Sequence, residues 1–163
     1  MEYVHIDQVK ALAHSAHNDI AMREHLFADA LGGERSDAYI ALWALTHLPQ
    51  ADTPYIAMHR DELTALALTT GDSSLRRLSM VLLERLEWTV DDVRTDLLDF
   101  CLEHMMMTDE PYGVRSLCIK LAYRQCHHYT ELKNELRQAL MLMEPSELGS
   151  GVRHTRNKIL KLL

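Results

Sequence analysis

The chain has 163 residues, of which 47% are apolar and 25% are charged, so a disordered, collagen-like or low-complexity protein is excluded. The formal net charge of −7 comes from 17 Lys and Arg against 24 Asp and Glu, and it counts against a role in binding nucleic acid. The longest apolar run, Ile40–Leu45, is far too short to cross a bilayer, and the first residues show no secretion signal. We therefore expect a cytoplasmic protein with no membrane segment.

Apolar residues recur with the period of an α-helix almost throughout, and no segment alternates as a strand does. Pro49 and Pro145 each end a helix, and Gly71 follows another. Thr89, with Asp92 three positions later, is typical of a helix start, whereas residues 149–151, Gly-Ser-Gly, are expected to form a loop. The predicted helices cover Asp37–Leu48, Pro54–Thr70, Leu75–Leu86, Thr89–His104, Pro111–Cys126, Thr130–Met143 and Val152–Leu163.

The helical segments repeat at a spacing of 38 or 39 residues, as the superposition of Ala41, Ser79, Cys118 and Arg156 shows. Helix pairs of this size are typical of α-solenoid repeats, which bury their apolar stripes by stacking on one another. The sequence therefore predicts an all-α fold, a right-handed α-α superhelix of about four helix pairs plus a C-terminal helix. In this prediction a single domain, 1–163, consists of a degenerate N-terminal pair (1–33), three repeats (36–70, 72–108 and 110–145) and a C-terminal capping helix (151–163).

Three arginines, Arg76, Arg115 and Arg153, coincide when the repeats are superposed. We expect them to be structural and to pair with acids of the adjacent repeat. The stretch Glu110–Leu117, EPYGVRSL, has its Pro, Val and Arg in the usual order of the first HEAT helix.

Over about residues 36–163 the chain resembles HEAT repeats and the related armadillo-like helical repeats. Its end is similar to that of short, uncharacterised bacterial HEAT-like proteins, through His128–Leu136 (HYTELKNEL) and the segment from Gly149 to Leu160. The resemblance implies a solenoid with an extended surface, but a HEAT fold does not define a function. HEAT-like di-iron hydroxylases use His-Glu dipeptides as ligands, and this chain has no such dipeptide.

Four carboxylates follow one another at helical spacing in the helix predicted to begin at Thr89: Asp92, Asp96, Asp99 and Glu103. Second helices of HEAT-like pairs line the concave surface, so this acidic stripe could face a groove, joined by Glu62, Glu131 and Glu135 of the neighbouring second helices. The groove would receive a basic peptide, a protein or a cation. The alternative is a solvated helix face, which such stripes usually are.

The last helix is basic and carries Arg153, Arg156, Lys158 and Lys161 without any acid. Such an end could bind an acidic partner, or let copies of the chain stack head to tail, so a homo-oligomer stays open. Cations near a C-terminus also suit the helix dipole without any partner.

Other residues give weaker signals. Cys101, Cys118 and Cys126 are expected to be buried, reduced thiols. Trp43 is expected in the core, whereas Trp88 falls in a loop and could be exposed. The histidines near the N-terminus, such as His14 and His17, lack a carboxylate or cysteine at matching positions, so no metal ligand is predicted.

No catalytic residue and no cofactor is predicted, because no phosphate-cradling loop, dinucleotide fingerprint or nucleophile motif occurs. The leading hypothesis is a protein-interaction module or scaffold that uses the concave face of the solenoid and binds another protein or a basic peptide segment. The alternative is a HEAT-like enzyme that acts on nucleic acid or a small molecule in the concave groove.

Overall fold

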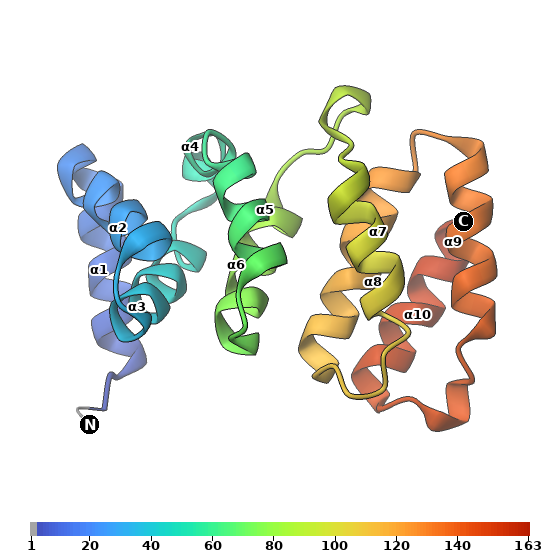
Figure 1. The fold of residues 1–163 in the computed structure, drawn as a ribbon. Helices are drawn as coiled ribbons and strands as arrows, with labels where there is room; N and C mark the ends of the chain where they lie inside the picture. Colours follow the sequence, from blue (N-terminus) through green and yellow to red (C-terminus); the bar gives the residue numbers. More distant parts are fainter. Residues whose placement is uncertain (1–2) are drawn as a thin grey trace. The chain divides into compact units, whose positions relative to one another are not determined.

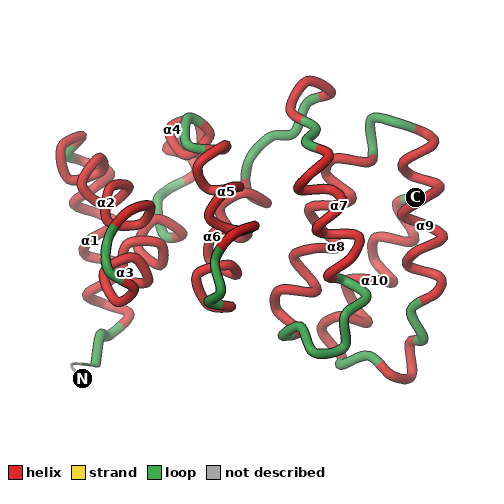
Figure 2. The backbone as a smooth tube through the Cα atoms, viewed as in Figure 1, coloured by secondary structure: helices red, strands yellow, loops and turns green. Residues whose placement is uncertain are grey.

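A computed structural model describes residues 3–163, and this part of the chain is all-helical, with ten α-helices, three short 3-10 helices and no strand. The predicted all-α class is confirmed. Most consecutive helices are joined by short loops (Figure 2). The chain forms two compact units, Met1–Leu86 and Glu87–Leu163.

Within the described residues, no helix combines the length and the apolar character that crossing a membrane requires.

The first unit contains α1 to α6, and their buried faces pack pairwise. Helix α2 packs against α1, α3 and α5, while α6 packs against α3, α4 and α5. The core holds large, fully buried side chains that include Phe27, Leu42, Leu45, Leu82 and Leu83. The α-helices of this unit are α1 (Ile6–Asn18), α2 (Ile20–Gly32), α3 (Arg35–Thr46), α4 (Thr53–Ala57), α5 (Arg60–Thr69) and α6 (Ser73–Arg85), and the 3-10 helix η1 is Gln50–Asp52.

The second unit is organised around α8, which packs against α7, α9 and α10 (Figure 1). Helix α8 buries residues on most of its circumference, including Val114, Cys118 and Ala122, as expected for a helix that has neighbours on several sides. The elements of this unit are α7 (Thr95–His104), α8 (Tyr112–Cys126), α9 (Thr130–Leu142) and α10 (Ser150–Leu162), with the 3-10 helices η2 (Val90–Asp92) and η3 (Pro145–Glu147).

Three predicted helix boundaries are wrong. The helix expected over Pro54–Thr70 is interrupted, because α4 ends at Ala57 and α5 begins at Arg60. The start signal at Thr89 caps only the short helix η2, and extended backbone at Val93 and Arg94 separates it from α7. The expected loop at 149–151 is not present as such, because only Gly149 precedes α10, which includes Ser150 and Gly151.

An arginine at the fourth position of four helices holds the end of the preceding segment. Arg115 Nε donates to the Met105 carbonyl at the end of α7 (3.0 Å), and Arg76 Nε donates to the Ala67 carbonyl of α5 (2.9 Å). Carbonyls at helix C-termini lack intrahelical donors and carry the negative end of the helix dipole, so a guanidinium suits them.

The other two arginines act in the same way. Arg153 Nε donates to the Pro145 carbonyl (3.0 Å), and Arg23 Nε donates to the Ala16 carbonyl of α1 (3.1 Å). The expected structural role of Arg76, Arg115 and Arg153 is therefore present, but the acceptors in these bonds are carbonyls rather than the predicted acids. Arg23 lies outside the 38-residue register, so the repeat pattern did not reveal it.

Neither tryptophan has the environment that the sequence predicts. Trp88 is only 5% exposed, although it lies in the loop between α6 and η2. Its carbonyl accepts a hydrogen bond from His128 Nε2 at 2.5 Å, which anchors the loop on the residues before α9. Trp43, by contrast, is only half-buried.

The three cysteines are free and buried, as predicted. A hydrogen bond with Cys118 and burial raise the pKa of Cys101 well above its usual value. Burial, with a smaller contribution from Glu135, raises the pKa of Cys126 to about 12. Thiols in such surroundings are unreactive.

Candidate functional site

The predicted acidic stripe is shorter in the structure than in the sequence. Asp96, Asp99 and Glu103 lie on α7 and are exposed, whereas Asp92 lies in η2 and is not part of that helix. The predicted four-residue spacing assumed one continuous helix from Thr89, and that assumption is wrong.

Asp92 has a local structural role. Its Oδ2 accepts hydrogen bonds from the backbone N–H and the hydroxyl of Thr89, each at 2.8 Å, in a capping box. The carboxylate therefore fixes the turn that leads from Trp88 toward α7.

We expect Asp92→Ala to lower the free energy of unfolding by about 1 kcal/mol, the usual cost of losing a cap. The matched control is Asp91→Ala at the exposed neighbouring carboxylate, which should change stability by less than about 0.5 kcal/mol. Urea denaturation followed by circular dichroism measures both values. Equal stability of the two variants would contradict the capping role.

The three acids on α7 differ in their electrostatic surroundings. Arg94 Nη2 lies 2.7 Å from Asp96 Oδ2, and this hydrogen bond is the main reason why the pKa of Asp96 is below its ordinary value. Asp99 and Glu103 make no ion pair with any described residue. Two unneutralised carboxylates, one helical turn apart, thus remain on the exposed side of α7.

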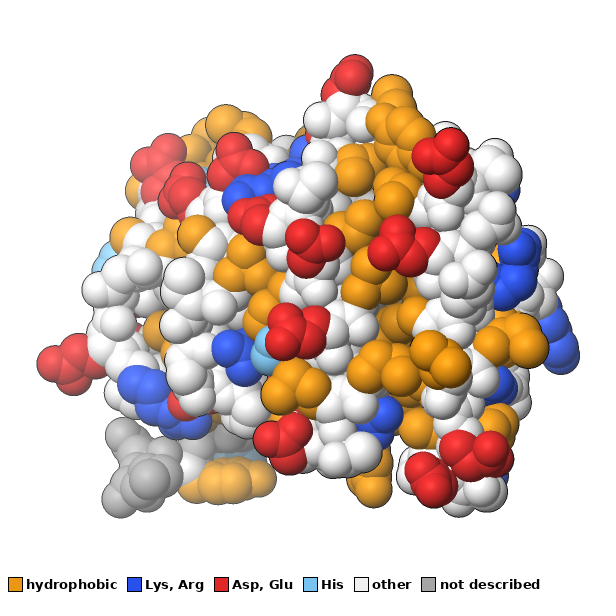
Figure 3. Space-filling model, turned by 45° about the vertical axis from the view of Figure 1, so that its right-hand side comes forward, with side chains coloured by type: hydrophobic (Ala, Val, Ile, Leu, Met, Phe, Trp, Pro, Cys, Tyr) orange, Lys and Arg blue, Asp and Glu red, His pale blue; other side chains and the backbone are white. Residues whose placement is uncertain are grey.

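The other acids of the predicted groove lie on other helices than this pair. Glu62 lies on α5 in the first unit, 3.4 Å from His59 Nδ1. Glu131 and Glu135 are exposed on α9. On the face drawn in Figure 3, acidic side chains are spread among hydrophobic and neutral ones.

The two arginines of α10 make hydrogen bonds within the second unit. Arg156 is 9% exposed and donates from Nε to the Leu140 carbonyl of α9 (2.9 Å) and from Nη1 to Asn157 Oδ1 (2.8 Å). Arg153 binds the carbonyls of η3 and of Leu148. Of the three predicted contact residues on α10, only Lys158 is exposed and without a hydrogen bond or ion pair to a described residue.

Two histidines are each paired with a buried acid. His17 Nδ1 lies 2.8 Å from the buried Asp52, and His104 Nδ1 lies 2.6 Å from the buried Glu110. Over residues 3–163, no cluster of three or more His, Cys, Asp or Glu could hold a metal ion.

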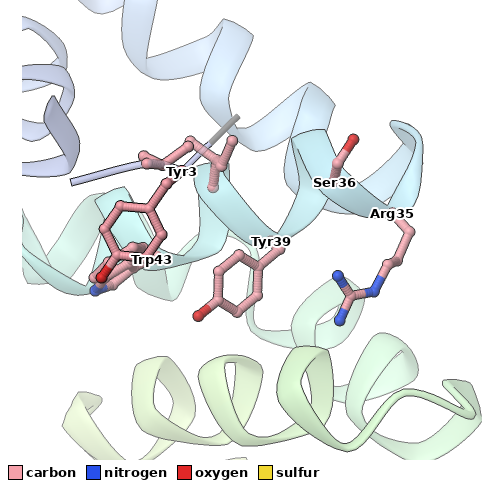
Figure 4. A pocket seen from close by; sticks show the side chains of 7 residues that line it. Tyr3, Arg35, Ser36, Tyr39 and Trp43 are labelled. Atoms are coloured by element: carbon pink, nitrogen blue, oxygen red, sulfur yellow. The ribbon is translucent and has the colours of Figure 1, made fainter. Parts of the chain in front are cut away.

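Sequence reasoning missed a pocket in the first unit. Arg35, Tyr39 and Trp43 leave the same side of α3 at intervals of four residues, and Tyr3 reaches the same cavity from the N-terminal segment (Figure 4). The cavity measures about 360 Å³ and is also lined by Val4, Ser36 and Ile40. The four-residue spacing of these side chains is a detectable signal, but the apolar neighbours of Trp43 in the sequence predict a core position for it instead.

The comparisons with known proteins give one result. The family model described as HEAT repeat domain matches residues 1–163. No curated protein and no solved structure matches the chain. Because the match spans the whole sequence and the described residues are all-helical, the chain belongs to the HEAT repeat domain family.

Proposed function

We propose that this chain is a protein-interaction module, and that α7 binds a basic segment of a protein partner. HEAT repeats are helical scaffolds typical of protein interaction, and such repeats offer long binding surfaces. The net charge of −7 favours a basic partner over a nucleic acid.

The observation that carries the proposal is the exposed pair Asp99 and Glu103, whose charges no described residue neutralises. Like charges one turn apart repel each other slightly, so a Lys or Arg from a partner relieves repulsion as well as adding attraction. Asp96 extends this surface by about one helical turn, but its negative charge is offset by the ion pair with Arg94. We leave Asp92 out of this surface because its carboxylate caps η2.

The test is affinity capture from source-cell lysate with the double charge reversal Asp99→Lys and Glu103→Lys. The matched control is Glu131→Lys with Glu135→Lys, which makes the same change in net charge on α9 of the same unit. We expect wild type and control to retain a partner at low salt and to release it at high salt, because salt screens exposed charges. The α7 reversal should retain none.

Equal retention by the α7 reversal and the wild type would overturn the proposal. Circular dichroism and the melting temperature of each variant check that these exposed substitutions leave the fold intact.

The division into repeats at 36–70, 72–108 and 110–145, the cytoplasmic location, the acidic partner for α10 and the homo-oligomer stay predictions. The alternative of an enzyme in the concave groove also stays a prediction.

A further inference from the structure

The pocket on α3 is lined by aromatic rings whose polar atoms are not used inside the described part of the chain. Tyr3 is 79% exposed, and Tyr39 and Trp43 are half-buried. Neither the Tyr39 hydroxyl nor Trp43 Nε1 makes a hydrogen bond to a described residue. From this chemistry we propose that the pocket binds a proline-rich segment of another protein in the polyproline II conformation.

The ring spacing fits such a segment. The centroids of the Tyr39 and Trp43 rings are 5.9 Å apart, with an interplanar angle of 50°. A polyproline II helix has three residues per turn and rises about 3.1 Å per residue, so residues two positions apart lie about 6 Å apart along its axis, close to the separation of the two ring centroids. Aromatic grooves recognise this helix because it is already ordered before binding.

The hydrogen-bonding groups of the pocket complement those of the segment. Trp43 Nε1 and the Arg35 Nη groups can only donate, and within residues 3–163 they make no hydrogen bond. Proline has a carbonyl acceptor but no N–H donor, so a proline-rich backbone presents chiefly acceptors. The free donors of the pocket can therefore bind the carbonyl acceptors of a proline-rich backbone, while its aromatic faces contact the pyrrolidine rings.

Arg35, the charged side chain that lines the pocket, is paired with an acid. Its Nε lies 2.6 Å from Asp72 Oδ2, while its guanidinium carbon lies 5.7 Å from the centre of the Tyr39 ring. Asp72 also caps α6 by accepting from Ser74 N and Leu75 N, and the hydrogen bond from Arg35 is the main cause of its lowered pKa. The ion pair favours an uncharged ligand over a cation or a phosphate.

The segment must come from outside these 163 residues. The four prolines of the chain, Pro49, Pro54, Pro111 and Pro145, stand apart and form no proline-rich run, so a second copy of this sequence cannot supply the ligand. This inference rests on the proposed function, because its ligand is a segment of a protein. The pocket lies at α3, whereas the surface of the proposed function lies on α7.

The test is binding of a dye-labelled, short polyproline peptide, measured by fluorescence anisotropy against a glycine-serine peptide of equal length. We expect the wild type to bind polyproline only. Tyr39→Ala and Trp43→Ala should each raise the Kd about tenfold, the usual effect of losing a central aromatic contact. The control Tyr112→Ala removes an exposed aromatic side chain of the second unit and should bind as the wild type does.

Tyr3→Ala keeps the test valid if the half-buried Trp43 variant fails to fold, because Tyr3 is highly exposed. This variant should raise the Kd several-fold. The proposal is overturned if the wild type does not bind polyproline, if the glycine-serine peptide binds equally well, or if the pocket variants bind unchanged.

The outcome is separable from that of the proposed function. The α7 reversal at Asp99 and Glu103 should bind polyproline with the Kd of the wild type. Loss of lysate capture by that variant thus concerns α7 alone, and loss of polyproline binding by Tyr39→Ala concerns the pocket alone.

Discussion

Replacing Trp88 with alanine should lower the free energy of unfolding by about 3–5 kcal/mol, the usual cost of truncating a buried aromatic side chain. Trp88 is almost fully buried although no regular helix contains it. The hydrogen bond from His128 goes to the backbone carbonyl, which alanine retains. Apolar burial and the cavity that truncation leaves therefore account for the main part of the expected loss.

The matched control is Trp43→Ala, which truncates the same side chain at a half-buried position that lines an open pocket. It should cost about 1 kcal/mol, a typical value for a substitution that leaves no core cavity. Urea denaturation of both variants, followed by circular dichroism, measures the difference. If Trp88→Ala cost no more than Trp43→Ala, the loop between α6 and η2 would not be packed as described.

The sequence could predict most of the helices because their signals are local. Hydrophobic period, prolines and caps located the helices to within a few residues, as for Thr130–Met143 against the observed Thr130–Leu142. The predictions for Trp43 and Trp88 were wrong because burial depends on neighbours distant in sequence. A loop position indicates exposure on average, but here the loop is anchored from His128, 40 residues away.

The candidate site was harder to predict because it depends on helix continuity. The spacing of Asp92, Asp96, Asp99 and Glu103 defines one face only if a single helix contains all four, and extended backbone at Val93 and Arg94 breaks it. A capping box indicates where a helix or turn begins, but it does not determine the length of the helix that follows. The sequence therefore located the acids of α7 correctly but could not show that Asp92 is separate from them.

The pocket on α3 was missed for a different reason. Tyr39 and Trp43 follow a helical period, and a helical period of aromatic residues usually indicates a core face. Only the fold shows that this side of α3 remains partly open and that Tyr3 reaches it. The repeat register shows that Arg76, Arg115 and Arg153 are equivalent, yet their carbonyl acceptors belong to no sequence pattern.

Replacing Arg115 with alanine should lower the free energy of unfolding by about 1.5–3 kcal/mol, the range found for hydrogen bonds that involve charged groups. Arg115 is only 5% exposed, and its Nε donates to the Met105 carbonyl at the C-terminal end of α7. Alanine would leave this carbonyl without that donor and remove the cation from the negative end of the helix dipole.

The equivalent variant Arg153→Ala provides the control, since Arg153 occupies the same helix position and also donates to carbonyls, but is exposed. Water can replace its lost bonds, so the expected cost is about 0.5–1 kcal/mol. Arg115→Lys keeps the charge but lacks the planar guanidinium fork, and it should fall between wild type and Arg115→Ala. Equal losses in Arg115→Ala and Arg153→Ala would mean that burial does not set the strength of this arginine contact. Full stability of Arg115→Lys would mean that charge alone, rather than the directed hydrogen bond, holds the end of α7 on α8.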